Sequence, residues 1–131
     1  MLLTVLIALK TKIMEFIMEI KELQAKVHES AVANGWWTDF KHHPDTLARV
    51  IALTHSELSE SLEEVREGRY YTYYSKTDLG DKPEGMFTEL ADAVIRIMDL
   101  FGHYHISLED TIIEKLAYND LRGFKHGGKI I

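Results

Sequence analysis

The sequence contains no cysteine and only two prolines among its 131 residues. Without cysteine the chain has no disulfides, thiolate metal ligands or cysteine nucleophiles, which agrees with a reducing compartment, so we expect a cytoplasmic protein. The eight glycines lie in no low-complexity stretch, unlike those of disordered or fibrous chains. With 46% hydrophobic residues, the chain is expected to fold as a single domain over residues 1–131.

Basic residues are also scarce, with 15 lysines and arginines against 21 acids and a net charge of -6. Nucleic-acid binding needs a clustered excess of basic residues, so this class is excluded. An acidic protein that binds phosphates needs a metal cation between the two. The apolar run Met1–Leu9 is stopped by Lys10 and Lys12, well short of the roughly 20 residues that span a bilayer. No basic residue precedes it, so we expect neither a membrane span nor a secretory signal.

Apolar residues recur three and four positions apart in four segments, which predicts four helices. The first carries an N-terminal extension over about residues 1–19 and ends near Asn34 and Gly35. Its long apolar seam either packs within the chain or joins two subunits. The other three are expected after a cap at Asp45, from the first turn at Pro83, and after a cap at Ser107.

The stretch from Arg69 to Lys82 lacks helical periodicity and is predicted to be a surface loop. Its four tyrosines are candidates for a lid or a subunit contact: Tyr70, Tyr71, Tyr73 and Tyr74. No segment shows the alternation of a half-buried strand. The predicted fold class is therefore all-α, a four-helix bundle with a long N-terminal helix.

Two pairs of acidic residues share one spacing. Glu57 and Glu60 lie three apart in the second predicted helix, and Glu89 and Asp92 lie three apart in the third. Residues three apart project from the same face of a helix, so two such pairs on neighbouring helices can converge. Four converging carboxylates repel one another unless a multivalent cation lies between them, and Mg²⁺ or Mn²⁺ suits such oxygen ligands.

A simpler interpretation competes with this metal site. Glutamates three apart usually mark a solvated helix face, and Arg96, four residues after Asp92, is a possible ion-pair partner for it. Asp92, however, lies in a mostly apolar helix, where a carboxylate needs an ion pair or a metal. Both interpretations remain open at the level of spacing.

On the fourth predicted helix, Lys115, Asn119 and Arg122 are four and three apart on one face, with Lys125 and His126 beyond them. Such a face can bind phosphate and ribose, or be an ordinary exposed surface. The loop before the second helix holds aromatic residues that can stack on a base or close a core. We expect one of Trp36 and Trp37 to be in the core and the other to approach a ligand.

The order of these features resembles a known family. HSELSESLEE followed by ELADAVIRIMDL is similar to the E-x-x-E and E-x-x-D helices of the MazG-like all-α nucleoside triphosphate pyrophosphatases. The likeness extends from about Ile20 to Lys129 and includes the loop with Trp37, Phe40 and His43 and the terminal KLAYNDLRGFKHGGK. Ser56 departs from members that carry an additional glutamate immediately before the first pair.

This resemblance implies an enzyme that hydrolyses nucleoside triphosphates, noncanonical or deoxy ones among them, to a monophosphate and pyrophosphate, by attack of water at the α-phosphorus. Glu57, Glu60, Glu89 and Asp92 would bind magnesium, and Glu57 or Glu60 would act in catalysis, with Glu57 favoured as the base. The substrate would contact the following residues: Trp37, Phe40, His43, Lys115, Asn119, Arg122, Lys125 and His126. The protein would be a homo-oligomer, either a dimer or a tetramer.

Two alternatives remain. A related pyrophosphohydrolase could act on another diphosphate-containing substrate such as phosphoribosyl-ATP, because the carboxylates bind metal and phosphates rather than the base. A helical interaction module without activity would instead use the same acids as surface charge.

Overall fold

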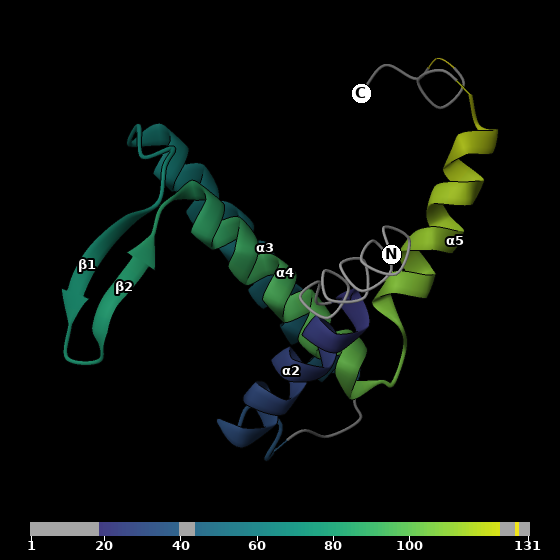
Figure 1. The fold of residues 1–131 in the computed structure, drawn as a ribbon, viewed down its shortest axis with the longest axis horizontal. Helices are drawn as coiled ribbons and strands as arrows, with labels where there is room; N and C mark the ends of the chain where they lie inside the picture. Colours follow the sequence, from purple (N-terminus) through teal and green to yellow (C-terminus); the bar gives the residue numbers. More distant parts are fainter. Residues whose placement is uncertain (1–18, 40–43, 124–127, 129–131) are drawn as a thin grey trace, which may run out of the picture.

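The computed structural model describes residues 19–39, 44–123 and 128, and these residues are mostly helical (Figure 1). The elements in chain order are α2 (Ile20–Ala33), α3 (Pro44–Arg66), β1 (Tyr73–Thr77), β2 (Gly80–Glu84), α4 (Met86–His103) and α5 (Leu108–Leu121). No helix in these ranges is both long and apolar enough to cross a membrane.

The two longest helices, α3 and α4, pack along each other, and α2 packs on α4 (Figure 1). Helix α5 contacts α2 and points away from the α3–α4 pair. The predicted four-helix bundle is therefore not evident within the described part of one chain, although the expected helical character is confirmed. The buried apolar residues in this part of the chain are few: Ala93, Met98 and Leu108.

Two helix ends follow the sequence prediction. Helix α2 is closed by Asn34, and Gly35 after it has the positive φ of 81° that a residue without Cβ adopts readily. Ser107 caps α5, because its side chain accepts a hydrogen bond from the Asp110 backbone N–H at 3.1 Å. The cap predicted at Asp45 is wrong by one residue, since α3 already includes Pro44 and Asp45 lies in its first turn.

The predicted surface loop contains an antiparallel β-hairpin, which corrects the all-α prediction. Strands β1 and β2 pair with Thr77 opposite Gly80, and Gly80 has a φ of 118° beside the two-residue turn. Pro83, expected in the first turn of a helix, lies in β2 opposite Tyr74. A two-stranded ribbon accepts proline because both of its strands are edges. The polar Ser75 and Lys76 in β1 hid the alternation by which a strand is recognised.

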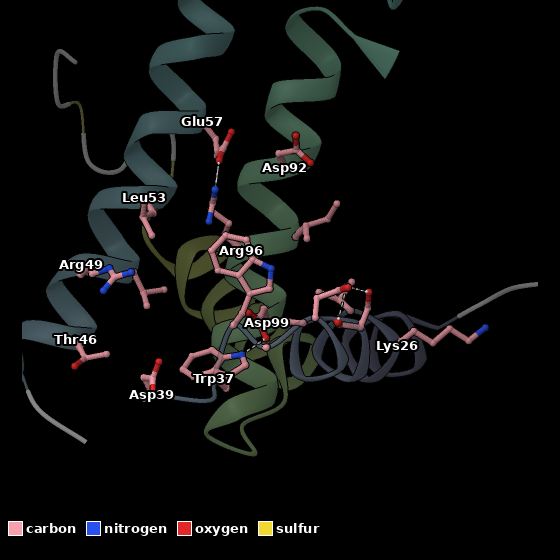
Figure 2. A pocket seen from close by; sticks show the side chains of 18 residues that line it. Lys26, Trp37, Asp39, Thr46, Arg49, Leu53, Glu57, Asp92, Arg96 and Asp99 are labelled. Carbon is pink, nitrogen blue, oxygen red and sulfur yellow. Dashed lines mark hydrogen bonds and ion pairs between the residues drawn. The ribbon is translucent and has the colours of Figure 1, made fainter. Parts of the chain in front are cut away.

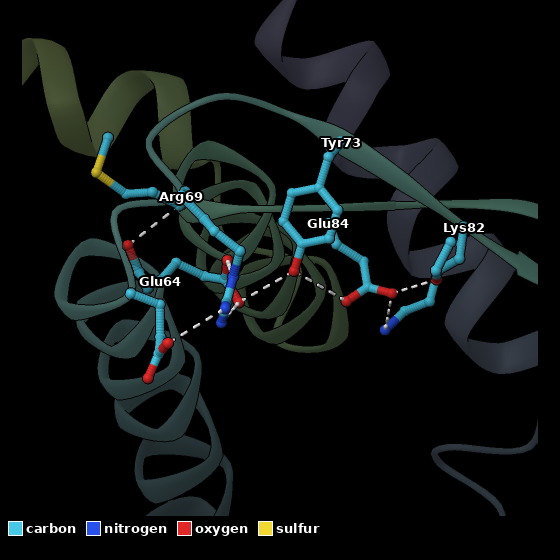
Figure 3. A network of polar contacts seen from close by, with 9 residues as sticks. Glu64, Arg69, Tyr73, Lys82 and Glu84 are labelled. Carbon is cyan, nitrogen blue, oxygen red and sulfur yellow. Dashed lines mark hydrogen bonds and ion pairs between the residues drawn. The ribbon is translucent and has the colours of Figure 1, made fainter.

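A polar network fastens this hairpin to the end of α3 (Figure 3). Arg69 donates from Nε and Nη2 to the two carboxylate oxygens of Glu64, at 2.7 and 3.2 Å. The Tyr73 hydroxyl lies 3.4 Å from oxygens of both Glu64 and Glu84. Lys82 forms an ion pair with Glu84 at 3.8 Å. The hairpin is thereby held where β2 leads directly into α4.

Apolar side chains form a stripe along α3 that is half exposed. Ile51, Leu58 and Leu62 are 51%, 46% and 50% exposed, and Leu90 and Val94 of α4 are similarly uncovered. The α3 face that meets α4 instead carries the buried polar residues Glu57 and Ser61. The side chains of the stripe therefore lack a covering layer among the described residues.

The crossing of α2 and α4 depends on a glycine. A Cβ built on Gly102 would lie 2.6 Å from the Cβ of His28, a separation that real side chains do not show. His28 also shares the carboxylate of Asp99 with Trp37, at 2.7 Å from its Nδ1 and 2.8 Å from the indole Nε1. The indole ring of Trp37 stacks on His103 with centroids 3.8 Å apart.

The substitution Gly102→Ala tests this crossing. Helix propensity alone predicts a gain of about 1 kcal/mol, whereas overpacking costs about 1–3 kcal/mol, so we expect net destabilisation. Urea unfolding measures it, with Ser59→Ala on the exposed side of α3 as a control that should change stability by less than about 0.5 kcal/mol. A more stable Gly102→Ala protein would contradict the close approach of the two helices.

Candidate metal centre

Three of the four predicted carboxylates converge. Oxygen atoms of Glu57 and Glu60 on α3 and Glu89 on α4 all lie within 4.8 Å of one another. The i, i+3 spacing directs the α3 pair to one side of the helix, and the packing of α4 on α3 brings Glu89 to them. The three differ in exposure: Glu57 is buried, Glu89 is half-buried and Glu60 is exposed.

Asp92 lies close to this group without being one of the three. Burial raises its pKa, and the nearby charge of Glu57 raises it further, while Arg96 and Lys82 act in the opposite direction. Asp92 and Glu57 also line the same cavity (Figure 2). The fourth predicted ligand is therefore beside the centre, one helical turn along α4 from Glu89.

The electrostatics of the centre are those of crowded like charges. Burial raises the pKa of Glu89, followed by the charges of Glu60, Asp92 and Glu57. Ionised carboxylates at this separation repel one another, and a multivalent cation between them removes the repulsion. Mg²⁺ prefers hard oxygen ligands and commonly keeps positions for water and substrate phosphates, so three carboxylates fit its chemistry.

Glu57 has a specific counter-charge. Arg96 of α4 reaches across to α3, and its Nε and Nη2 both lie 2.6 Å from Oε1 of Glu57. The i, i+4 spacing instead offers Arg96 as an ion-pair partner for Asp92 on the same helix. In the structure, Arg96 forms an ion pair with Glu57. Its charge still opposes the rise in the pKa of Asp92 that burial and Glu57 cause.

A cavity of about 910 Å³ adjoins the centre between α2, α3 and α4 (Figure 2). This volume is within the range of about 300–1,000 Å³ that is usual for small-molecule sites. Its wall combines aromatic and apolar side chains with polar groups. They include Lys26, Ser30, Asn34, Asp39, Arg49 and Arg96 together with Glu57 and Asp92. Spacing in the sequence gave no sign of Lys26, Arg49 or Asp39, because they come from different elements.

The two tryptophans both line the cavity but differ in their contacts. Trp37, the predicted substrate contact, is held by Asp99 and His103. Trp36 is 65% exposed, and the guanidinium of Arg96 lies 5.9 Å from its ring centroid. Trp36 therefore offers the more accessible ring.

Three of the remaining predicted substrate contacts are described by the structure and are not brought to the cavity. Lys115, Asn119 and Arg122 are on or at the end of α5, and none of the three is among the residues that line it. Lys115 instead lies 5.2 Å from the ring centroid of Tyr118. Phe40, His43, Lys125 and His126 lie outside the described residues.

Comparisons with protein-family models, curated proteins and solved structures find no significant match to this chain.

The raised pKa of Glu89 predicts how metal-free stability depends on pH. Folding favours the protonated carboxyl, so stability present below the ordinary pKa of 4.5 is lost as the pH rises through the raised value. Glu89→Gln should therefore unfold at a higher temperature than the unsubstituted protein at about pH 7.5 in EDTA. The difference should vanish below pH 4.5.

Thermal unfolding with and without Mg²⁺ checks this prediction. The exposed Glu63→Gln on α3 is the control and should leave the unfolding temperature nearly unchanged at each pH. Added Mg²⁺ should stabilise the unsubstituted protein more than Glu89→Gln. Equal unfolding temperatures for all three proteins at about pH 7.5 would contradict the crowding of these charges.

Proposed function

We propose that the chain is a magnesium-dependent pyrophosphohydrolase of nucleoside triphosphates that yields a nucleoside monophosphate and pyrophosphate. The observation that carries this proposal is the convergence of Glu57, Glu60 and Glu89 beside a cavity of nucleotide size. The resemblance to MazG-like pyrophosphatases in the E-x-x-E and E-x-x-D segments supports the same reaction. A cytoplasmic location follows from the proposal, because the protein would act on cellular nucleotide pools.

Glu57, Glu60 and Glu89 would hold the cation through one oxygen each. When bound, Mg²⁺ supplies charge neutralisation for the triphosphate and lowers the pKa of water. Trp36 would offer its exposed ring to the base, since stacking requires an accessible aromatic face. Trp37, fixed by Asp99, would close the inner wall.

Asp92 is better suited than Glu57 to accept the proton of the attacking water. Both nitrogens of Arg96 that contact Glu57 lie near the same oxygen, and Glu57 is also one of the three carboxylates that would hold the cation, so it is already engaged. Asp92 lies outside the group of three, and burial raises its pKa toward the range where a carboxylate accepts protons effectively. In the proposed step, the oxygen of water forms a bond to the α-phosphorus. The bond from that phosphorus to the bridging oxygen breaks, pyrophosphate leaves, and the proton goes to Asp92.

A panel of ribo- and deoxyribonucleoside triphosphates with Mg²⁺ tests the activity, with pyrophosphate and orthophosphate measured separately. We expect pyrophosphate release, at least a hundredfold slower in Glu60→Gln and in Asp92→Asn; this is an order-of-magnitude expectation for loss of a ligand or a base. Glu63→Gln, exposed and paired with Arg66, is the matched control and should retain activity.

Metal titration then separates the roles of the two acids. Glu60→Gln should weaken Mn²⁺ binding, whereas Asp92→Asn should bind Mn²⁺ nearly as the unsubstituted protein does. If phosphoribosyl-ATP is the only substrate that releases pyrophosphate, the protein would be the related pyrophosphohydrolase. If no substrate releases pyrophosphate, the result would favour the interaction module. Its binding surface would then be the exposed apolar face of α3 and α4.

A second copy of the chain would cover that apolar face. Pairing two α3–α4 units through Leu58, Leu62, Leu90 and Val94 would form a four-helix bundle between subunits and bury the exposed stripe. Glu60 is two residues from both Leu58 and Leu62, about 200° around the helix, so it points to the opposite side. Asp92 has the same relation to Leu90 and Val94. The carboxylates would thus stay accessible in a dimer, or in a tetramer built from two dimers.

Leu62→Glu tests this assembly by sedimentation equilibrium. We expect the unsubstituted protein to be at least a dimer of the 15.1 kDa chain, and Leu62→Glu to dissociate because a charge would be buried at the bundle centre. Leu79→Glu is the control, since Leu79 at the hairpin turn is 101% exposed and off this face. A monomeric unsubstituted protein would refute the second copy.

A further inference from the structure

Glu57 is the one carboxylate of the converging group that is buried, with only 6% of the residue exposed. A buried ionised carboxylate needs a close counter-charge or hydrogen-bond donors. Arg96 supplies both, because two of its nitrogens lie within hydrogen-bond distance of the carboxylate. Its own side chain is 29% exposed, so the ion pair is largely shielded from solvent.

The contact is one-sided. Arg96 Nε and Nη2 both approach Oε1 of Glu57, at 2.6 Å each. Among the described residues, no hydrogen bond or ion pair is formed by the second oxygen, Oε2. A guanidinium that gripped both oxygens in parallel would occupy the whole carboxylate. Here one oxygen is held and the other is left for a different ligand.

Arg96 is itself restrained at its other side. Its guanidinium carbon lies 5.9 Å from the centroid of the Trp36 ring, within the range of a cation–π contact. The three side chains come from three segments: the turn after α2, helix α4 and helix α3. Trp36, Arg96 and Glu57 also all line the same cavity.

We propose that Arg96 is a positioning residue: by holding Oε1 of Glu57, it presents the other oxygen of that carboxylate to a divalent cation shared with Glu60 and Glu89. This inference rests on the proposed function, since it requires that the three carboxylates bind a cation. Groups that orient metal ligands in this way typically contribute 10- to 100-fold to metal affinity.

The opposite role for Arg96 predicts the opposite effect. If Arg96 were a counter-ion that occupied the site until a metal displaced it, removing its charge would strengthen metal binding. Positioning predicts weaker binding, because Glu57 without Arg96 would lose the contact that fixes the orientation of its carboxylate. The sign of the change in affinity therefore decides between the two roles.

The experiment measures Mn²⁺ binding without nucleotide, from the electron paramagnetic resonance signal of the free ion. We expect Arg96→Met to bind Mn²⁺ roughly 10- to 100-fold more weakly than the unsubstituted protein. Arg96→Lys should lie between them, because an ammonium keeps the charge but not the planar pair of donors. Arg66→Met is the matched control: it removes the same charge from an exposed ion pair with Glu63 and should change affinity less than about twofold.

A double substitution separates positioning from general damage. Glu57→Gln/Arg96→Met leaves no unpaired buried charge, so it should fold even if Arg96→Met does not. Its Mn²⁺ affinity should equal that of Glu57→Gln, because Arg96 acts only through Glu57. A further loss of affinity in the double variant would overturn the proposal.

The remaining outcomes distinguish this proposal from the proposed function. Unchanged or tighter Mn²⁺ binding by Arg96→Met, with normal binding by the unsubstituted protein, would overturn the role of Arg96 alone. No Mn²⁺ binding by the unsubstituted protein would remove the metal centre itself, and the role of Arg96 with it.

Discussion

Carboxylates that face one another between α3 and α4 are the constraint on which the rest of this structure depends. Oxygens of Glu57, Glu60 and Glu89 lie within 4.8 Å of one another. Burial raises the pKa of Glu89, and the charges of Glu60, Asp92 and Glu57 raise it further. Packing charge between two helices opposes folding unless counter-charge is present. Arg96 provides part of it by pairing with Glu57. The pair of helices thus carries an electrostatic cost that a bound cation would relieve.

This constraint also explains where the apolar residues are. The side of α3 that meets α4 carries Glu57 and Ser61, so it cannot also carry the leucine stripe. The stripe with Leu58 and Leu62 lies on a different side and stays half exposed. In an ordinary amphipathic helix the apolar side would face the helix's own chain. Here α3 uses one side, which is polar, to contact α4 of its own chain. It has a separate apolar side for the proposed second copy.

Local patterns were enough to predict the helices, the Ser107 cap and the shared face of Glu57 and Glu60, because each follows from spacing along one helix. Features that depend on tertiary contacts were not predictable. The polar residues of β1 concealed the hairpin, in which Tyr73 contacts Glu64 of α3, the carboxylate that Arg69 also holds. Arg96 was matched with Asp92 because they are four residues apart, whereas packing places Glu57 within 2.6 Å of it. Spacing within one helix cannot reveal a partner on another.

The position of α5 bears on how a triphosphate would be neutralised. The sequence placed this role on Lys115 and Arg122, yet neither lines the cavity in one chain. The cationic residues that do line it are Lys26, Arg49 and Arg96, from three different helices. Arg96 is already paired with Glu57, so Lys26 and Arg49 are the cavity cations without an ion pair among the described residues. In the proposed function, a divalent cation held by the three carboxylates would supply the rest of the positive charge that a triphosphate needs on this acidic chain.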